Sequence, residues 1–173
     1  MEIRKGVRLH KIKTTKFKDI AVSIRFQNML EKKNACARSL LALMLCDRSI
    51  AYDTKKKMSD KQDALYGATL SAQTAGFGAS QIIEIRSKII NPHFIDDEKQ
   101  IVEEWVNFIK EILFSPLLTQ EAFDESKHIL LSKIERMMDD PGQYVISQGL
   151  KKAGEGTPLA ISALGEKKVM WML

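Results

Sequence analysis

The side chains best suited to chemistry are few in this chain and lie far apart. The three histidines, His10, His93 and His128, fall in different stretches, and none has a second histidine three to five residues away. The two cysteines, Cys36 and Cys46, are ten positions apart, a spacing that puts them on different faces of a helix. Zinc sites need such ligands to recur within about one helical turn or in Cys-x-x-Cys pairs, so no metal site of usual spacing is expected.

Other catalytic patterns are also absent from the sequence. There is no Gly-x-Ser-x-Gly elbow, and neither cysteine has an obvious basic neighbour that would lower its pKa. The glycines of GFGAS lie between two strand-like stretches and indicate a hairpin turn rather than a phosphate loop. The residues alone therefore predict a folded domain without a visible active site.

Composition indicates a globular domain in a reducing compartment. Of the 173 residues, 45% are hydrophobic and 28% are charged, which suffices for a substantial core. No run approaches the roughly 18 to 20 apolar residues of a membrane span, and the N-terminus lacks the apolar stretch of a signal peptide. Both cysteines lie in an apolar helical stretch, which is a poor place for a disulfide. We expect a cytoplasmic protein without membrane association.

Positive charge is concentrated near the N-terminus. The net charge is +5, and residues 1 to 33 hold ten Lys or Arg against three acidic residues. One interpretation is a basic hairpin that binds an acidic partner, with Lys11, Lys13 and Lys16 as its surface. The other is that these lysines are the solvated face and edge guard of a strand. No aromatic platform or nucleic-acid motif accompanies them, so nucleic acid is not expected as a partner.

Hydrophobic patterning predicts strands and helices in alternating pairs. Strict alternation over 20 to 26 indicates a strand, which we expect to form a hairpin with 7 to 13. Helices are predicted over 30 to 46 and from Ser59, with Gln62 completing a capping box. The remaining predicted elements are strands at 68 to 75 and 80 to 90, and helices at 97 to 114, from Thr119 to Met138, and after Asp140 and Pro141.

This order predicts an α+β fold in which helices are layered on a mostly antiparallel sheet. No linker, repeat or low-complexity segment divides the chain, so residues 1 to 173 are expected to form one domain. The ending GEKKVMWML is apolar and has no polar tail. We therefore expect a truncated domain of a longer, multi-domain protein.

Three stretches carry a family resemblance: ARSLLALMLCDRSIAY at 37 to 52, DALYGATLSAQTA with IIEIRSKIINPHF, and LLTQEAFDESKHILLSKIERMMDDPGQY. Together with the element order, they resemble the N-terminal domain of the pitrilysin, insulinase and mitochondrial-processing-peptidase family of zinc peptidases. The resemblance covers nearly all of residues 7 to 168. It implies the family's processing-peptidase-like fold and, in active members, a zinc cofactor.

The resemblance also places the family's zinc motif on residues that cannot bind zinc. Active members carry His-x-x-Glu-His on the first helix, and the matching positions here are Ser39, Ala42 and Leu43. A shift by one residue gives Arg38, Leu41 and Ala42 instead. The third ligand position matches Lys133, and a supporting glutamate seven residues earlier matches Ser126. Neither register supplies a ligand or a base.

The degenerate bacterial members of the family suggest what such a chain does. The resemblance implies a non-catalytic homologue that partners a catalytic chain, or self-associates, and binds peptide or protein substrate. An alternative is an active zinc endopeptidase with displaced ligands, which would need His, Glu or Asp side chains to converge in space. A third is a binding module that uses the basic surface at Lys11, Lys13 and Lys16.

Overall fold

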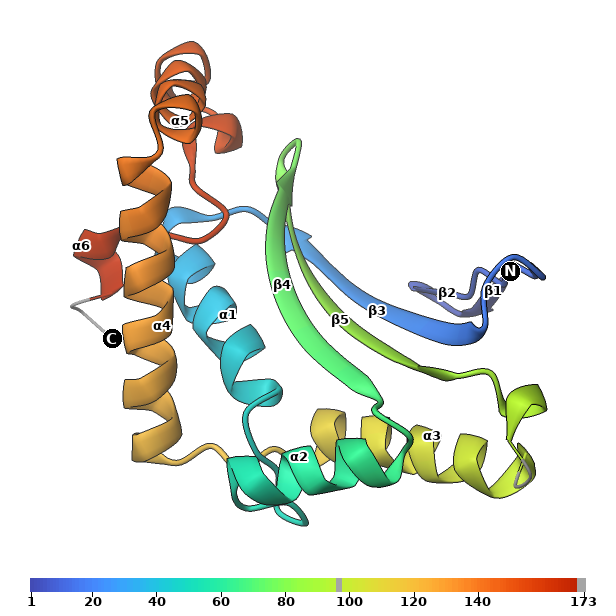
Figure 1. The fold of residues 1–173 in the computed structure, drawn as a ribbon. Helices are drawn as coiled ribbons and strands as arrows, with labels where there is room; N and C mark the ends of the chain where they lie inside the picture. Colours follow the sequence, from blue (N-terminus) through green and yellow to red (C-terminus); the bar gives the residue numbers. More distant parts are fainter. Residues whose placement is uncertain (96–97, 171–173) are drawn as a thin grey trace.

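A three-stranded antiparallel sheet forms the centre of the fold (Figure 1). The computed structural model describes residues 1–95 and 98–170, and its sheet has the order β3-β5-β4. Strand β5 (Ser80–Ile90) pairs along its whole length with β3 (Asp19–Met29) and, from Ser80 to Lys88, with β4 (Thr69–Phe77). The β4–β5 turn contains Gly78 at φ +56°, a conformation that most side chains avoid.

Alternation along β5 gives the sheet one apolar face. Ile83, Ile85, Ser87 and Ile89 are buried together, as the sequence predicts. The one hydroxyl in this set is satisfied, because the indole nitrogen of Trp105 donates to the Ser87 oxygen at 2.7 Å. A polar group buried in this way costs little free energy when its hydrogen bond is made.

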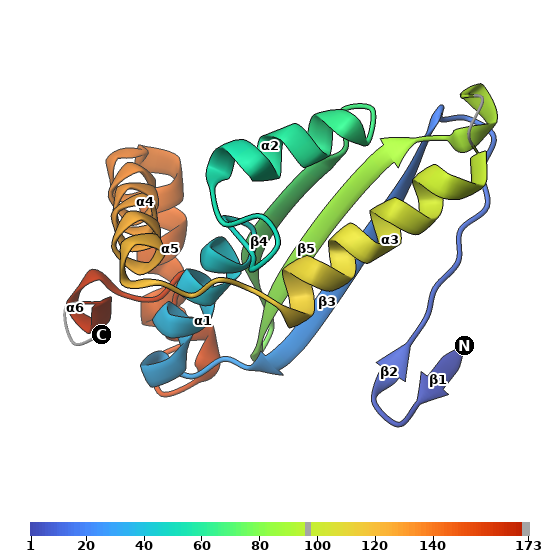
Figure 2. The ribbon, with the colours of Figure 1, turned by 90° about the horizontal axis from the view of Figure 1, so that it is seen from below.

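The helices cover this apolar face and leave the other face open (Figures 1 and 2). Helices α2 (Lys55–Ala64) and α3 (Glu98–Phe114) pack under the sheet in one core cluster, to which α3 contributes Trp105 and Phe108. Helices α1 (Lys32–Leu45) and α4 (Gln120–Asp139) form a second cluster beside it. Helix α5 (Pro141–Ala153), the short helix α6 (Lys167–Met170) and single 3₁₀ turns at Pro92–Phe94 and Pro158–Ala160 complete the described fold. The predicted α+β class is confirmed.

Of the three N-terminal helix caps that the sequence predicts, two are confirmed and one is wrong. Thr119 accepts from the backbone N–H of Ala122, and Asp140 accepts from those of Gly142 and Gln143, so both predicted caps are confirmed. The prediction that α2 begins at Ser59 is wrong: it begins at Lys55, where Thr54 accepts from the N–H of Lys57 at 3.2 Å. Both Thr54 and Ser59 are residues that favour such a cap, and sequence alone did not rank them. The predicted start of α3 at residue 97 lies outside the described residues.

The N-terminal segment does not form the predicted hairpin with β3. Strand β1 (Glu2–Arg4) pairs only with β2 (Val7–Arg8), while β3 pairs with β5. Residues 9 to 18, which include Lys11, Lys13 and Lys16, have no strand and are exposed. The alternation in β3 correctly indicated a strand, but its partner is β5, which follows β4 in the sequence.

The described residues contain no helix that is long and apolar enough to cross a membrane.

On the open face of the sheet, a buried carboxylate organises the polar side chains. Glu84 lies in the middle of β5 with only 7% of its side chain exposed. It accepts hydrogen bonds from Ser23, Gln73, Arg25 and Arg86, which lie on all three strands. The Ser23 hydroxyl contributes most to lowering the pKa of Glu84 to about 2, the other donors act in the same direction, and burial opposes them.

We expect Glu84→Gln to lower the free energy of unfolding by about 2 kcal/mol near pH 7, as for hydrogen bonds to a charged group. Because the folded pKa lies below the ordinary value of 4.5, this stabilisation is present above that value and is lost as the pH falls toward 2. Urea unfolding across this range should show wild type and variant converging. Glu103→Gln, on the exposed surface of α3, serves as the control and should change little. A wild-type advantage that persists undiminished at pH 2 would contradict the proposed ionisation.

Candidate functional site

The positions that the resemblance assigns to the zinc motif meet in space. Ser39, Ala42 and Leu43 of α1 line the same small cavity as Lys133 of α4. The cavity measures about 20 Å³, far below the roughly 300–1,000 Å³ of small-molecule sites. Its other lining residues come from β4, α4 and the segment before α6, namely Ala72, Gln73, Thr74, Leu130 and Leu164.

The three α1 positions of the alternative register, Arg38, Leu41 and Ala42, do not meet at one cavity. Arg38 donates through its guanidinium to the backbone oxygen of Met29 at 2.7 Å and also contacts Gln81 at 3.4 Å. Leu41 is 40% exposed, so α1 is not buried on every side. Of this triplet, only Ala42 lines the cavity with Lys133.

Ser39 has a structural task where active relatives are expected to have a ligand. Its hydroxyl donates to the backbone oxygen of Ala163 at 3.0 Å, and the amide of Gln81 donates to the same oxygen at 2.7 Å. Gln81 also donates to the backbone oxygen of Ala35 at 2.9 Å. These bonds tie α1, β5 and the segment around residue 163 together.

A close backbone approach reinforces this junction. Gly165 has φ +89°, and a Cβ placed there would lie 2.6 Å from atoms of Cys36 on α1. Only glycine fits both the conformation and the space. This junction was not predicted from sequence, although Gln81 gave a signal, because it is an amide among the apolar residues of β5.

The predicted supporting position, Ser126, is buried on α4 and does not line the cavity. The neighbouring glutamates that displaced ligands would require are engaged elsewhere. Glu125 binds Arg48 and Lys55, and Glu135 forms an ion pair with Lys167 at 2.6 Å. Within residues 1–95 and 98–170, no three His, Cys, Asp or Glu side chains are grouped so that they could hold a metal ion.

The histidines and cysteines remain apart, as their spacing predicts. His10, His93 and His128 are exposed and lie, respectively, before β3, in the 3₁₀ turn after β5, and on α4. Both thiols are free, and burial raises the pKa of Cys36 and raises that of Cys46 to about 12. A thiol with a raised pKa is a poor nucleophile at neutral pH.

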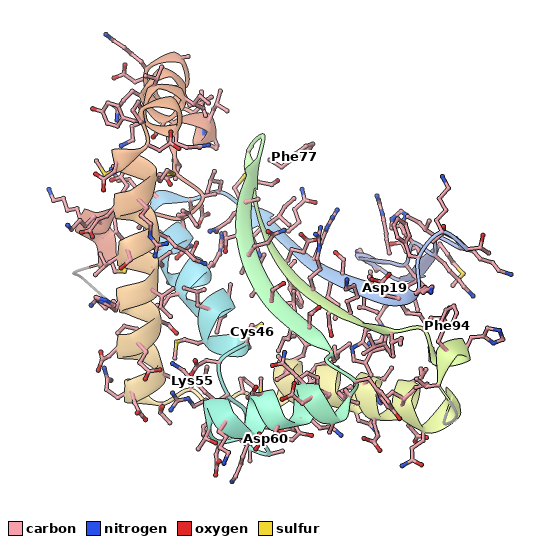
Figure 3. All side chains as sticks on the ribbon, in the orientation of Figure 1. Asp19, Cys46, Lys55, Asp60, Phe77 and Phe94 are labelled. Carbon is pink, nitrogen blue, oxygen red and sulfur yellow. The ribbon has the colours of Figure 1, made fainter. Side chains whose placement is uncertain are left out.

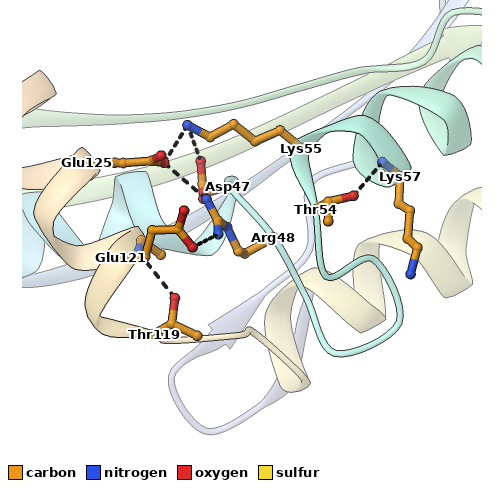
Figure 4. A network of polar contacts seen from close by, with 9 residues as sticks. Asp47, Arg48, Thr54, Lys55, Lys57, Thr119, Glu121 and Glu125 are labelled. Atoms are coloured by element: carbon orange, nitrogen blue, oxygen red, sulfur yellow. Dashed lines mark hydrogen bonds and ion pairs between the residues drawn. The ribbon is translucent and has the colours of Figure 1, made fainter.

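An ion-pair network holds the exit of α1 against the start of α4 (Figure 4). Arg48 is only 7% exposed and binds Asp47 at 2.7 Å and both Glu121 and Glu125 at 3.0 Å. Lys55 adds contacts to Asp47 and Glu125. Hydrogen bonding to Asp47 is the largest cause of the raised pKa of Arg48. The sequence signal for this network was the pair of glutamates four residues apart, which share one face of α4.

We expect Arg48→Ala to destabilise the fold by about 2 kcal/mol, because the nearly buried Asp47 loses a charged hydrogen-bond partner, while Glu121 and Glu125 stay open to solvent. Urea unfolding at pH 7 measures this loss. Lys57→Ala removes an exposed ion pair with Asp53 and should cost under about 1 kcal/mol. Equal effects of the two substitutions would show that Arg48 does not hold the helices together.

Comparison with known proteins supports the resemblance drawn from sequence. No protein-family profile matches the chain. The probable inactive metalloprotease YmfF of Bacillus subtilis (strain 168) is 26% identical over 166 residues, which cover 93% of this chain and 39% of that protein. The chain therefore spans about two-fifths of the length of this curated relative.

Solved structures show the same fold. A conserved protein from Enterococcus faecalis V583 matches with a TM-score of 0.83 and 25% identity, over 94% of this chain and 39% of that one. The peptidase M16 inactive domain from Pseudomonas fluorescens matches with a TM-score of 0.66 and 15% identity, over 92% of this chain and 36% of that one. The chain is thus similar in sequence to a probable inactive metalloprotease and has the fold of a peptidase M16 inactive domain, and its sequence lacks His-x-x-Glu-His.

Proposed function

We propose that this chain is a non-catalytic zinc-peptidase homologue that serves as the partner or substrate-binding subunit of a catalytic homologous chain in peptide processing. One observation carries the proposal: the cavity where α1 meets α4 is lined by Ser39, Ala42, Leu43 and Lys133. These four residues are the degenerate motif positions in this proposal. None of the first three can bind zinc, and the ammonium of a lysine repels a dication.

The chemistry around that cavity supports a structural role for the former site. The Ser39 hydroxyl donates a hydrogen bond to the backbone oxygen of Ala163, so this side chain stabilises the packing of α1 against that segment. A cavity of about 20 Å³ has no room for a substrate side chain. Substrate, a peptide or protein, would then be bound in a chamber that this chain encloses together with its catalytic partner.

A cytoplasmic setting is part of the proposal. Both cysteines are free thiols inside the fold, which suits a reducing compartment. No group of metal-ligating side chains in the described residues favours the alternative of an active zinc enzyme with displaced ligands.

The purified chain should contain far less than one equivalent of zinc after dialysis without chelator, measured by elemental mass spectrometry. Alone it should not cleave a mixed peptide library. Mixed with an M16 chain from the same genome that carries His-x-x-Glu-His, it should bind that chain and raise its kcat/KM. One zinc per chain together with chelator-sensitive cleavage by the chain alone would overturn the proposal.

The motif register can be tested by restoring a site. The variant Ser39→His, Ala42→Glu, Leu43→His, Lys133→Glu should bind one zinc, because four positions lining one cavity then carry the ligands and the base. Zinc-dependent stabilisation in thermal unfolding is the readout, since the larger side chains will by themselves destabilise the fold by about 1–3 kcal/mol. The matched control, Arg38→His, Leu41→Glu, Ala42→His, Lys133→Glu, should gain nothing from zinc. Zinc stabilisation of the control alone would mean that the assigned register is wrong.

A further inference from the structure

The open face of the sheet has an ordered pattern of charge. Two rows cross it: Ala21, Lys88 and Thr69 pair side by side, and Ser23, Arg86 and Ser71 pair beside them. In each row a cation on the central strand stands between small side chains of the two outer strands. These six residues, which we name the cationic trough, line a groove of about 450 Å³ together with Val22 and Ser87.

The cations of the cationic trough are exposed but held in place. The side chains of Arg86 and Lys88 are 55% and 51% exposed. Arg86 and Arg25 both bind the single carboxylate of Glu84, and Lys88 binds Asp19 at 2.8 Å. One positive charge is therefore unmatched among these groups, and the guanidinium groups keep donors free for an incoming carboxylate.

The same face becomes apolar toward the β4–β5 turn. Beyond Glu84 the outward positions on the three strands are Gln27, Ile82 and Ala75, then Met29, Ser80 and Phe77. Met29 is 63% exposed and Phe77 is 74% exposed. Figure 3 shows Phe77 extending from the turn toward the open side of the sheet. The face is thus cationic at one end and apolar at the other.

No described helix lies over this face, and the β1–β2 hairpin stands off beyond β3 (Figures 1 and 2). Antiparallel sheets commonly leave one face in water, but large apolar side chains such as Met29 and Phe77 are unusual on a solvated face and favour contact with a partner. From Lys88 to Ser80 a strand rises about 26 Å, the length of a helix of about 18 residues. Two residues along a strand rise about 6.6 Å, close to the roughly 6 Å rise between positions i and i+4 of a helix.

We propose that this face binds an amphipathic acidic helix of a partner polypeptide. Carboxylates four residues apart contact Arg86 and Lys88 in the cationic trough, and apolar side chains at the other end cover Ile82, Met29 and Phe77. The cations of the trough favour carboxylates at one end of the bound helix. The apolar end of the sheet face disfavours nucleic acid, whose phosphates would need cations along the whole length of the surface. This inference stands apart from the proposed function and holds whether or not the partner is a peptidase.

The test uses the 173-residue chain and a synthetic 18-residue helical peptide with glutamates at i and i+4 in its first turns and leucines on the same face of its last turns. Fluorescence anisotropy gives the affinity, and amide shifts of the ¹⁵N-labelled chain give the location. The peptide with glutamine in place of glutamate should bind about tenfold more weakly, which corresponds to 1.4 kcal/mol. The shifted amides should lie on β3, β4 and β5.

Protein variants separate the two ends of the surface. Lys88→Gln should weaken binding about threefold, as for one exposed ion pair, and Phe77→Ser should weaken it without changing its salt dependence. Ser71→Trp fills the cationic trough while keeping its charges and should abolish binding. Lys110→Gln, an exposed lysine on α3, is the matched control and should have no effect.

Four results would overturn the proposal. The first is equal binding of the peptide and its glutamine version, and the second is amide shifts on α5 or on residues 9 to 18. The third is tighter binding of an oligonucleotide of equal length to this face. The fourth is a dimer in light scattering, in which a second copy of this chain covers the face.

Discussion

The pairing of β5 with a strand on each side is the constraint on which the rest of this structure depends. Its side chains alternate between the two faces of the sheet, as in any strand, and pairing along both edges fixes which set meets the helices. On the apolar face Ile83, Ile85 and Ile89 receive the helices. On the other face Glu84 gathers donors from all three strands. A slip of one residue in this register would exchange the two faces and remove both the core and the carboxylate network.

The junction between α1 and the sheet follows from the same register. Gln81 lies on the apolar face of β5, and its amide binds backbone oxygens of Ala35 and Ala163. Ser39 binds Ala163 as well, and Gly165 permits the close approach to Cys36. Buried small residues and hydrogen bonds to the backbone stabilise this packing without a metal ion. In the proposed function, the site has thereby become part of the scaffold.

The two candidate surfaces of this chain lie on opposite sides of the sheet. The cavity with Ser39 and Lys133 is on the side of the helices, and the cationic trough is on the open side. Because the two surfaces lie on opposite sides, substitutions at one leave the contacts of the other unchanged. The proposed acidic partner helix would therefore use the open side whether or not the cavity binds a metal ion.

The sequence by itself determined the class of fold, most of its elements and the absence of the family's zinc motif. Local signals sufficed for these, since β5 alternates, α3 has one apolar stripe, and Thr119 and Asp140 cap their helices. Sequence did not determine which strand pairs with β3, because alternation reports a buried face and carries no information about the partner strand. Nor could it bring Lys133 beside Ser39, join Arg48 to two glutamates more than 70 residues away, or align Arg86 and Lys88 between small side chains. Those arrangements depend on contacts between distant segments, which only the packed tertiary structure fixes.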